Sequence, residues 1–342
     1  MGALCSFDRL VVGCPRRCAR SIPRGSFPGA AGALRADDRR RRVESEIVTE
    51  DKSRAAVLTE VSLLLAVLFL GTNPVAVKLA VLDVPPLPFV AIRFLMAGLL
   101  LLLVAFSLGR GREVGRKDLL SMAGVGLVGV GMNNISFTLG VSMTTASETA
   151  LIYAAVPIWG ILLGLALGLE RPTLWGIVGV ALAFLGVGVV VYGGLGGGAG
   201  SSLEGDLLVV IATICWGSYT VLSLPLLRTY SPIVVAGYTM LFGGLGALPL
   251  ALPGFAAAGW SEVGGQAWGA VAYSTLLVAA YGFWAWQWGV SRVGANRVLV
   301  YQYLITLVGV ASGVVLLGES LTVNKILGGA VILLGVYLAR RQ

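Results

Sequence analysis

The sequence predicts an all-α integral membrane protein whose ten transmembrane helices form two inverted five-helix repeats. Three observations predict this fold class. The 342 residues are 57% hydrophobic and only 12% charged, whereas soluble domains carry about 25% charged residues. After Ala55 the chain divides into apolar runs of about 20 residues, the length that crosses a bilayer. One glutamate-containing stretch occurs twice, which indicates duplication of a helical bundle.

The N-terminal residues 1–54 differ in composition from the rest. Nearly half of the 25 Lys and Arg residues lie there, together with many Gly and Pro residues and a basic cluster from Arg39 to Arg42. High charge and low hydrophobicity predict a disordered basic cytoplasmic tail.

The apolar runs that follow predict the spanning helices in order. We place them at 57–80, 87–108, 118–139, 145–168, 173–192, 206–227, 232–252, 267–289, 295–316 and 322–340. The Gly-rich stretch 193–205 predicts a flexible linker. It divides the membrane part into a first repeat at 55–192 and a second repeat at 206–342.

The duplicated stretch covers residues 167–187 and 316–336. At one fixed offset the two copies match at Leu167/Leu316, Glu170/Glu319, Thr173/Thr322, Gly179/Gly328 and Gly186/Gly335. Because each repeat has an odd number of spans, the second repeat must enter the membrane the opposite way up. The two copies therefore predict an inverted-topology repeat.

The distribution of basic residues predicts the orientation. If the N-terminus is cytoplasmic, the cytoplasmic connections carry the Lys and Arg residues and the opposite connections carry none. We therefore expect a multi-pass protein of the plasma (inner) membrane with both termini in the cytoplasm. Lys78, Arg93 and Lys325 fall near outer span ends, where we expect them to snorkel to the interface.

The sequence excludes several kinds of chemistry. It contains no histidine, so a Ser-His dyad, an HExxH zinc site and a His-ligated haem are impossible. No GxxxxGK[ST] loop occurs, which argues against ATP drive within this chain. We expect no catalytic residues, no metal, no cofactor and no nucleic-acid partner, and so no enzyme.

A set of short motifs resembles a known family. These are the two glutamate turns, Gly71-Thr72-Asn73-Pro74 in the first span, Arg93-Phe94 in the second and Trp216-Gly217-Ser218-Tyr219 in the sixth. Their order resembles the EamA-type, ten-helix branch of the drug/metabolite transporter superfamily, over about residues 58–340. The resemblance implies export or exchange of small metabolites or drugs.

The repeated turns and glycines are expected to be structural. A Glu-x-x-Thr turn supplies acceptors to the free amides of a helix start, so Glu170, Thr173, Glu319 and Thr322 predict structural turns. A gating or proton-coupling role for the glutamates is the alternative. Glycines such as Gly179 and Gly186, and Gly124 and Gly129, predict close helix contacts.

Polar residues inside the first repeat are candidate substrate-binding residues, because each is costly in hydrocarbon unless it faces a cavity or a partner. They are Asn73, Asn133, Asn134, Glu148 and Tyr153. For Glu148 the alternatives are binding of an amine or a proton, a solvated position near the outer end of its span, or pairing with Lys78 or Arg93.

The second repeat adds aromatic candidates for the same site. They are Trp216, Tyr219, Trp284, Tyr301 and Tyr303. An aromatic cavity suits a flat, amphipathic or weakly cationic solute. Trp286 and Trp288 are expected to belong to an interfacial aromatic belt instead.

These features predict a secondary, non-ATP transporter that exports or exchanges a small metabolite or drug-like solute by alternating access. Its expected partners are that solute and the lipid bilayer, with proton or counter-solute coupling open. The alternative is a non-transporting membrane scaffold or a channel-like protein.

Overall fold

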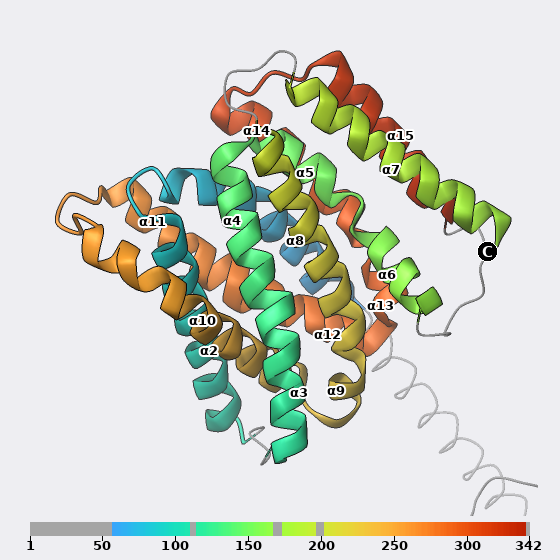
Figure 1. Cartoon of the computed structure of the whole chain (residues 1–342). Coiled ribbons are helices and arrows are strands. Elements are labelled where there is room, and N and C mark those ends of the chain that lie inside the picture. Colours follow the sequence, from blue (N-terminus) through green and yellow to red (C-terminus); the bar gives the residue numbers. More distant parts are fainter. Residues whose placement is uncertain (1–56, 110–113, 167–172, 196–201, 340–342) are drawn as a thin grey trace, which may run out of the picture. The chain divides into compact units, whose positions relative to one another are not determined.

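The computed structural model describes residues 57–109, 114–166, 173–195 and 202–339, and every regular element in these ranges is helical (Figure 1). The first helix is Val57–Ala80. The elements that follow are α2 (Pro86–Ser107), α3 (Arg116–Gly126), η1 (Leu127–Met132), α4 (Asn133–Met143), α5 (Ala146–Tyr153), α6 (Val156–Ala166), α7 (Leu174–Leu195), α8 (Leu203–Leu222), α9 (Leu224–Thr229), α10 (Pro232–Ala257), α11 (Gly265–Tyr273), η2 (Ser274–Phe283), α12 (Trp284–Val293), α13 (Ala295–Val298), α14 (Tyr301–Leu317) and α15 (Val323–Ala339).

Eight helices of the described ranges are long and apolar enough to cross a membrane. They are Val57–Ala80, Pro86–Ser107, Arg116–Met143, Ala146–Ala166, Leu174–Gly193, Leu203–Thr229, Pro232–Ala257 and Ala295–Leu317. Val323–Ala339 is a shorter apolar helix. The predicted span 267–289 is helical throughout, as α11, η2 and α12, but it is not one of the eight. The all-helical membrane fold is confirmed, while the count of ten remains a prediction.

The outer surface of the helices is apolar. Large side chains such as Leu103, Leu120 and Val315 are 69%, 73% and 78% exposed. Exposed apolar surface on this scale would aggregate in water. It fits a surface that faces lipid.

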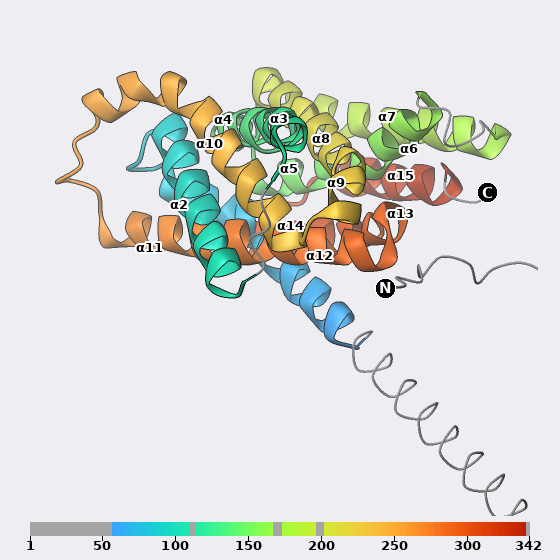
Figure 2. The ribbon, with the colours of Figure 1, turned by 90° about the horizontal axis from the view of Figure 1, so that it is seen from below.

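The helices of the two repeats pack in equivalent pairs (Figures 1 and 2). α7 lies against α15, α2 against α10 and α5 against α14. In the predicted order of spans these are the fifth with the tenth, the second with the seventh and the fourth with the ninth. Each helix of these pairs therefore contacts its own counterpart, as helices next to a two-fold axis between the repeats would do.

The glycines of the duplicated stretch form the α7–α15 contact. A Cβ atom added at Gly179 would lie 2.5 Å from the carbonyl oxygen of Gly335, and one added at Gly335 would lie 2.7 Å from that of Gly179. Gly186 and Gly328 meet in the same reciprocal way, at 2.8 and 2.9 Å. The predicted close contacts at Gly179 and Gly186 are therefore confirmed.

The glycine prediction is wrong at Gly124, because a Cβ atom there would meet nothing within 4 Å. Gly129, by contrast, lies directly against the side chain of Tyr219. Spacing along the chain identified small residues but could not tell which of them face another helix.

Two π-helical segments occur at equivalent positions. η1 interrupts the third span of the first repeat and η2 the third span of the second, related by the offset that relates Glu170 to Glu319. A π-turn accommodates an extra residue and reorients the side chains that follow, and such turns are frequent at functional sites. Asn133 and Asn134 follow η1 directly, and Phe283 is the last residue of η2.

The predicted linker at 193–205 is shorter in the structure. α7 extends to Leu195 and α8 begins at Leu203, with Ser202 as its N-cap. The stretch 196–201 lies outside the described residues, as do the tail at 1–54 and Glu170.

Candidate functional site

A small cavity lined by both polar and apolar side chains lies between the two repeats. Its volume is about 50 Å³, measured as the space open to the centre of a water molecule. The first repeat supplies Leu70, Gly71, Asn73, Pro74, Asn133, Asn134, Phe137, Thr149, Ala150 and Tyr153, and the second supplies Trp216, Phe283, Gln302, Ile305 and Thr306. Five of the predicted candidates, Asn73, Asn133, Asn134, Tyr153 and Trp216, are thus brought together in one wall.

The two asparagines after η1 are held by a hydrogen-bond network. Asn133 Nδ2 donates to the carbonyl oxygen of Ala212 (2.6 Å) and to the hydroxyl of Tyr153 (3.1 Å). Asn134 Nδ2 donates to Asn133 Oδ1 (3.0 Å) and to the carbonyl oxygen of Val130 (2.9 Å). These bonds fix the amide groups at the cavity and link α4 to α8.

Other polar atoms of the cavity wall have no hydrogen-bond partner among the described residues. Gln302 Oε1 and Thr306 Oγ1 are both buried and unsatisfied. Each such atom costs about 1–3 kcal/mol in an apolar interior. Gln302 occupies the position equivalent to Tyr153, so the two repeats contribute counterpart residues to the same cavity.

Aromatic rings from both repeats line the cavity. In the second repeat Trp216 packs edge-on against Phe283, with ring centroids 4.8 Å apart, and in the first repeat Tyr153 packs against Phe137 at 5.3 Å. Sequence reasoning missed Phe137 and Phe283, because an apolar ring in an apolar helix carries no distinguishing signal.

Arg93 lies one side chain behind the cavity wall. Its Nε donates to the carbonyl oxygen of Ser274 (3.1 Å), and Ser274 Oγ donates to Asn73 Oδ1 (3.2 Å) at the wall. Its guanidinium carbon is 4.8 Å from the centre of the Phe94 ring, which packs against Phe283.

The guanidinium of Arg93 is fully buried, so the prediction that it snorkels is wrong. Nη1 and Nη2 have no hydrogen-bond partner among the described residues. An arginine on the second helix of a bundle was expected to reach water. Instead, it points inward, where the rings of Phe89 and Phe94 offset part of its desolvation.

The remaining aromatic candidates do not line the cavity. Tyr219 is buried behind Trp216, with its hydroxyl 3.1 Å from Thr239 Oγ1. Trp284 stacks on Trp288 at a separate surface hollow. The hydroxyl of Tyr301 donates to Glu60. Tyr303 packs in an apolar cluster around Leu151 and Ile332.

Trp286 does not belong to an interfacial belt. It is 1% exposed, packs against Trp216 with ring centroids 5.4 Å apart, and donates from Nε1 to Thr220 Oγ1 (3.1 Å). Helical periodicity, rather than the local run of tryptophans, decides its direction: it lies on the inner face of α12, while Trp284 and Trp288 are half-buried.

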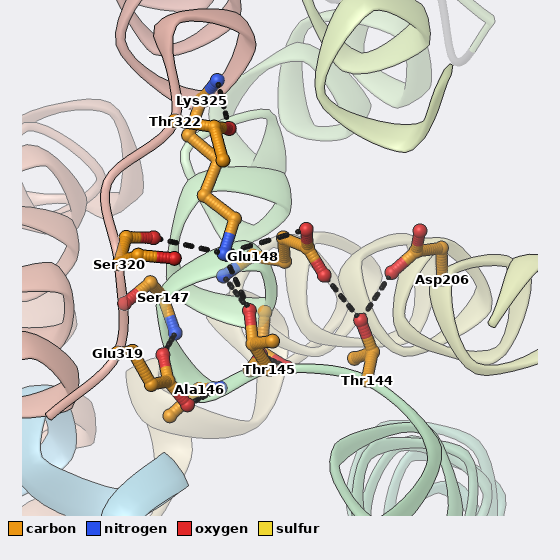
Figure 3. A network of polar contacts seen from close by, with 11 residues as sticks. Thr144, Thr145, Ala146, Ser147, Glu148, Asp206, Glu319, Ser320, Thr322 and Lys325 are labelled. Atoms are coloured by element: carbon orange, nitrogen blue, oxygen red, sulfur yellow. Dashed lines mark hydrogen bonds and ion pairs between the residues drawn. The ribbon is translucent and has the colours of Figure 1, made fainter. Parts of the chain in front are cut away.

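A second polar cluster surrounds the start of α5 (Figure 3). Glu148 Oε1 lies 3.5 Å from Lys325 Nζ of α15, and both side chains are buried. Lys325 Nζ also donates to Thr145 Oγ1 (3.2 Å) and to the carbonyl oxygen of Ser320 (3.4 Å). Glu148 is therefore neither solvated nor paired with Arg93, and Lys325 does not snorkel.

Glu319 caps α5, which belongs to the other repeat. Its Oε1 accepts from the amide of Ala146 (2.7 Å) and its Oε2 from the amide of Ser147 (2.8 Å). Gly318 ends α14 in the left-handed conformation, at φ 67°, and so turns the chain ahead of this glutamate. The turn was predicted to cap the start of the helix that follows it, but its glutamate caps α5 instead of α15.

The two threonines of the duplicated turns are placed alike. Thr173 Oγ1 accepts from the amide of Gly176 (3.0 Å) at the start of α7, and Thr322 Oγ1 accepts from the amide of Lys325 (3.4 Å) at the start of α15. Both therefore act as N-caps of the reciprocal helix pair.

Asp206 was not predicted to belong to this cluster, because it is the first residue of the predicted span 206–227. Its side chain is 1% exposed and lies beside Glu148, with Thr144 between them. Thr149 and Thr306 were missed too. A short hydroxyl side chain in a helix normally bonds its own backbone, as Thr149 does with the carbonyl oxygen of Thr145 (2.9 Å), and gives no sign of a site.

A bundle of two related helical repeats, apolar outside and with a cavity between them, defines a multi-pass membrane protein. The sequence profile of the EamA-like transporter family matches residues 57–192 and 203–341, so each repeat is matched once. The chain belongs to this family, whose members are named as transporters rather than enzymes.

Similar proteins carry transporter names. The chain is 26% identical over 282 residues to an uncharacterized transporter of Archaeoglobus fulgidus, covering 82% of this chain and 98% of the relative. It is 30% identical over 250 residues to a probable terminal-alkyne amino-acid exporter of Streptantibioticus cattleyicolor, covering 73% and 82%. It is 26% identical over 284 residues to a probable amino-acid metabolite efflux pump of Salmonella typhimurium, covering 80% and 92%.

A solved crystal structure has the same fold. It superimposes with a TM-score of 0.57 at 21% identity, over 83% of this chain and 96% of that one. At this level of identity the likeness concerns the fold alone.

Proposed function

We propose that the protein is a secondary transporter that moves a small metabolite by alternating access through the cavity between its repeats. The observation that carries this proposal is a pair of buried polar atoms in that cavity, Gln302 Oε1 and Thr306 Oγ1, which have no hydrogen-bond partner among the described residues. A scaffold gains nothing from buried atoms that lack partners, whereas a binding site does, because a solute supplies the missing bonds.

The position of the cavity between the two repeats also supports alternating access. Both repeats contribute to its wall, so a movement of one repeat against the other changes which side of the membrane it faces. Two states alone do not produce transport. The solute must also bind differently to each of them.

The proposed solute carries a carboxylate. Arg93 is joined to Asn73 through Ser274, and its Nη1 and Nη2 have no hydrogen-bond partner among the described residues, so a positive charge lies one side chain behind the cavity wall. The amino-acid exporter and the amino-acid metabolite efflux pump among the relatives carry names that imply carboxylate-bearing solutes, as does a probable biotin transporter of Pseudomonas aeruginosa. The small cavity must widen to admit such a solute.

The test is flux in proteoliposomes that contain the purified protein and a panel of radiolabelled amino acids and other small carboxylates. Protein-dependent, saturable flux of at least one of them supports the proposal. Absence of flux across the whole panel contradicts it and favours a scaffold. Flux that rises linearly with concentration, without saturation, favours a channel.

Thr306→Val should separate binding from folding. Valine keeps the shape of threonine but removes an unsatisfied hydroxyl, so we expect thermal stability to be unchanged or raised while KM for transport increases about tenfold, the loss of one good hydrogen bond. Thr275→Val is the matched control, because Thr275 is buried outside the cavity and its hydroxyl bonds the carbonyl oxygen of Val271 (2.7 Å). Equal effects of both variants on KM would contradict the site.

Arg93→Gln should discriminate between solute classes. Glutamine removes the positive charge behind the wall, so flux of carboxylates should fall at least tenfold, while binding of the corresponding neutral amides should change little. Competition by carboxylate and amide forms of the same solute measures this ratio. A parallel loss for both forms would show that Arg93 only supports the fold.

A further inference from the structure

A single hydroxyl group lies between two buried carboxyl groups. Thr144 Oγ1 is 2.8 Å from Glu148 Oε2 and 2.7 Å from Asp206 Oδ1 (Figure 3). Asp206 and Glu148 are each 1% exposed, and Thr144 is 0% exposed. Thr144 and Glu148 belong to the first repeat and Asp206 to the second.

This geometry requires one proton in addition to the hydroxyl hydrogen of Thr144. A threonine hydroxyl has one hydrogen to donate, and an ionised carboxylate can only accept. Two ionised carboxylates at hydrogen-bond distance from one hydroxyl would leave one of the contacts as two oxygen lone pairs facing each other. Both contacts become hydrogen bonds only if one carboxyl group is protonated and donates to Thr144 Oγ1 while Thr144 donates to the other.

The surrounding charges favour the same proton count. Among the described residues the cluster contains three acidic groups and two basic ones. The acidic groups are Glu148 on α5, Asp206 on α8 and Glu319 before α15. The basic groups are Lys325 on α15 and Lys78 on the first helix, and Lys78 lies within electrostatic range of Glu148, Glu319 and Lys325. The described parts of α7 and α14 carry no charged residue. Fully ionised, the cluster has one excess negative charge. One added proton makes it neutral, which burial strongly favours.

The contacts identify the protonated group. Glu148 faces the ammonium group of Lys325 at 3.5 Å, which stabilises its ionised form. Asp206 Oδ2 is buried with no hydrogen-bond partner among the described residues, a poor setting for a charged oxygen. A protonated Asp206 needs only its Oδ1 contact with Thr144.

We propose that Asp206 carries an exchangeable proton and that this cluster is the proton-coupling site of the transporter. The protonated carboxyl group of Asp206 donates a hydrogen bond to Thr144, and Thr144 donates to Glu148 of the Glu148–Lys325 ion pair. The ligand is a proton. It is released as H⁺ when Asp206 becomes an anion. Because α5 comes from one repeat and α8 and α15 from the other, a movement between repeats that separates Asp206 from Thr144 and admits water would release it. The coupling role rests on the proposed transport function, whereas the bound proton does not.

Infrared spectroscopy tests the proton directly. The wild-type protein at neutral pH should show a C=O band of a protonated carboxyl group, and Asp206→Asn should remove it. Glu148→Gln should remove it as well, because that variant takes away the excess negative charge that the proton neutralises. Glu204→Gln is the matched control, since Glu204 lies on the same turn of α8 but is exposed, and it should leave the band unchanged. Absence of the band in the wild type would overturn the proposal without any variant.

Transport under an imposed pH difference tests the coupling. For one proton per solute, a difference of about one pH unit supports up to about tenfold accumulation. Asp206→Asn fixes the site in an uncharged form, so accumulation should fall to equilibrium while solute exchange without a gradient continues. A wild-type flux that ignores the pH difference would overturn the coupling role even if the infrared band is present. If no solute moves at all, the proposed transport function fails, and the infrared band alone decides whether the proton is bound.

Discussion

Replacing Lys325 by methionine is expected to destabilise the protein by about 3–5 kcal/mol, the cost of leaving a buried charge without its partner. Lys325 is the cation next to Glu148, at 3.5 Å, and its ammonium group also satisfies Thr145 Oγ1 and the carbonyl oxygen of Ser320. Methionine retains the length and apolar character of the side chain, so the change removes charge rather than volume. Denaturant unfolding in detergent measures the loss.

A double-mutant cycle separates the ion pair from packing. Glu148→Gln combined with Lys325→Met should recover at least about 1.5 kcal/mol relative to the sum of the single changes, because no buried charge is then left unpaired. Strictly additive effects would show that the two groups do not stabilise each other.

Replacing Gly179 by alanine should disrupt the contact between α7 and α15. The added Cβ atom would overlap the backbone of α15 at Ala339 and lie 2.5 Å from the carbonyl oxygen of Gly335, and neither is a flexible side chain that can move away. Overpacking of this kind costs about 1–3 kcal/mol. The melting temperature of the purified protein should fall accordingly.

Gly188→Ala provides the control on the same helix. Gly188 is exposed and meets nothing within 4 Å, so alanine should be neutral or slightly stabilising there through its higher helix propensity. If Gly179→Ala were as stable as Gly188→Ala, the close approach of the two helices would be refuted.

The fold was largely predictable because lipid imposes a simple rule on the chain. Apolar length gives helices, and the duplicated glutamate turns give the repeat. The helix starts at Thr173 and Thr322 carry local caps that spacing along the chain can suggest. Each of these caps joins residues that are three apart in sequence, so a sequence pattern can reveal it.

The site was only partly predictable because its partners come from the other repeat. Glu319 reaches α5, and Lys325 and Asp206 approach Glu148 from α15 and α8. Thr145-Ala146-Ser147-Glu148 has the spacing of a capping box, whose glutamate would normally turn back to its own helix start. Here Thr145 does accept from the amide of Glu148 (3.1 Å), but the carboxylate faces Lys325 and Thr144. No local pattern distinguishes these two outcomes.

The surroundings of Arg93, like those of Glu148, could not be predicted from the local sequence. Its place near a span end predicted contact with water, because an arginine in hydrocarbon is expensive. The direction of its side chain depends on which face of α2 meets α10 and η2, and that is a property of the assembled bundle.

The reciprocal glycine contact between α7 and α15 has a consequence for how the two halves are held together. The two halves contact each other through equivalent surfaces, as identical subunits do in a symmetric dimer. Two separate chains would have to meet by diffusion and lose their translational freedom on association. In one polypeptide the halves are already tethered, and their effective concentration is high. The contact between α7 and α15 therefore does not need the affinity that would hold two separate chains together.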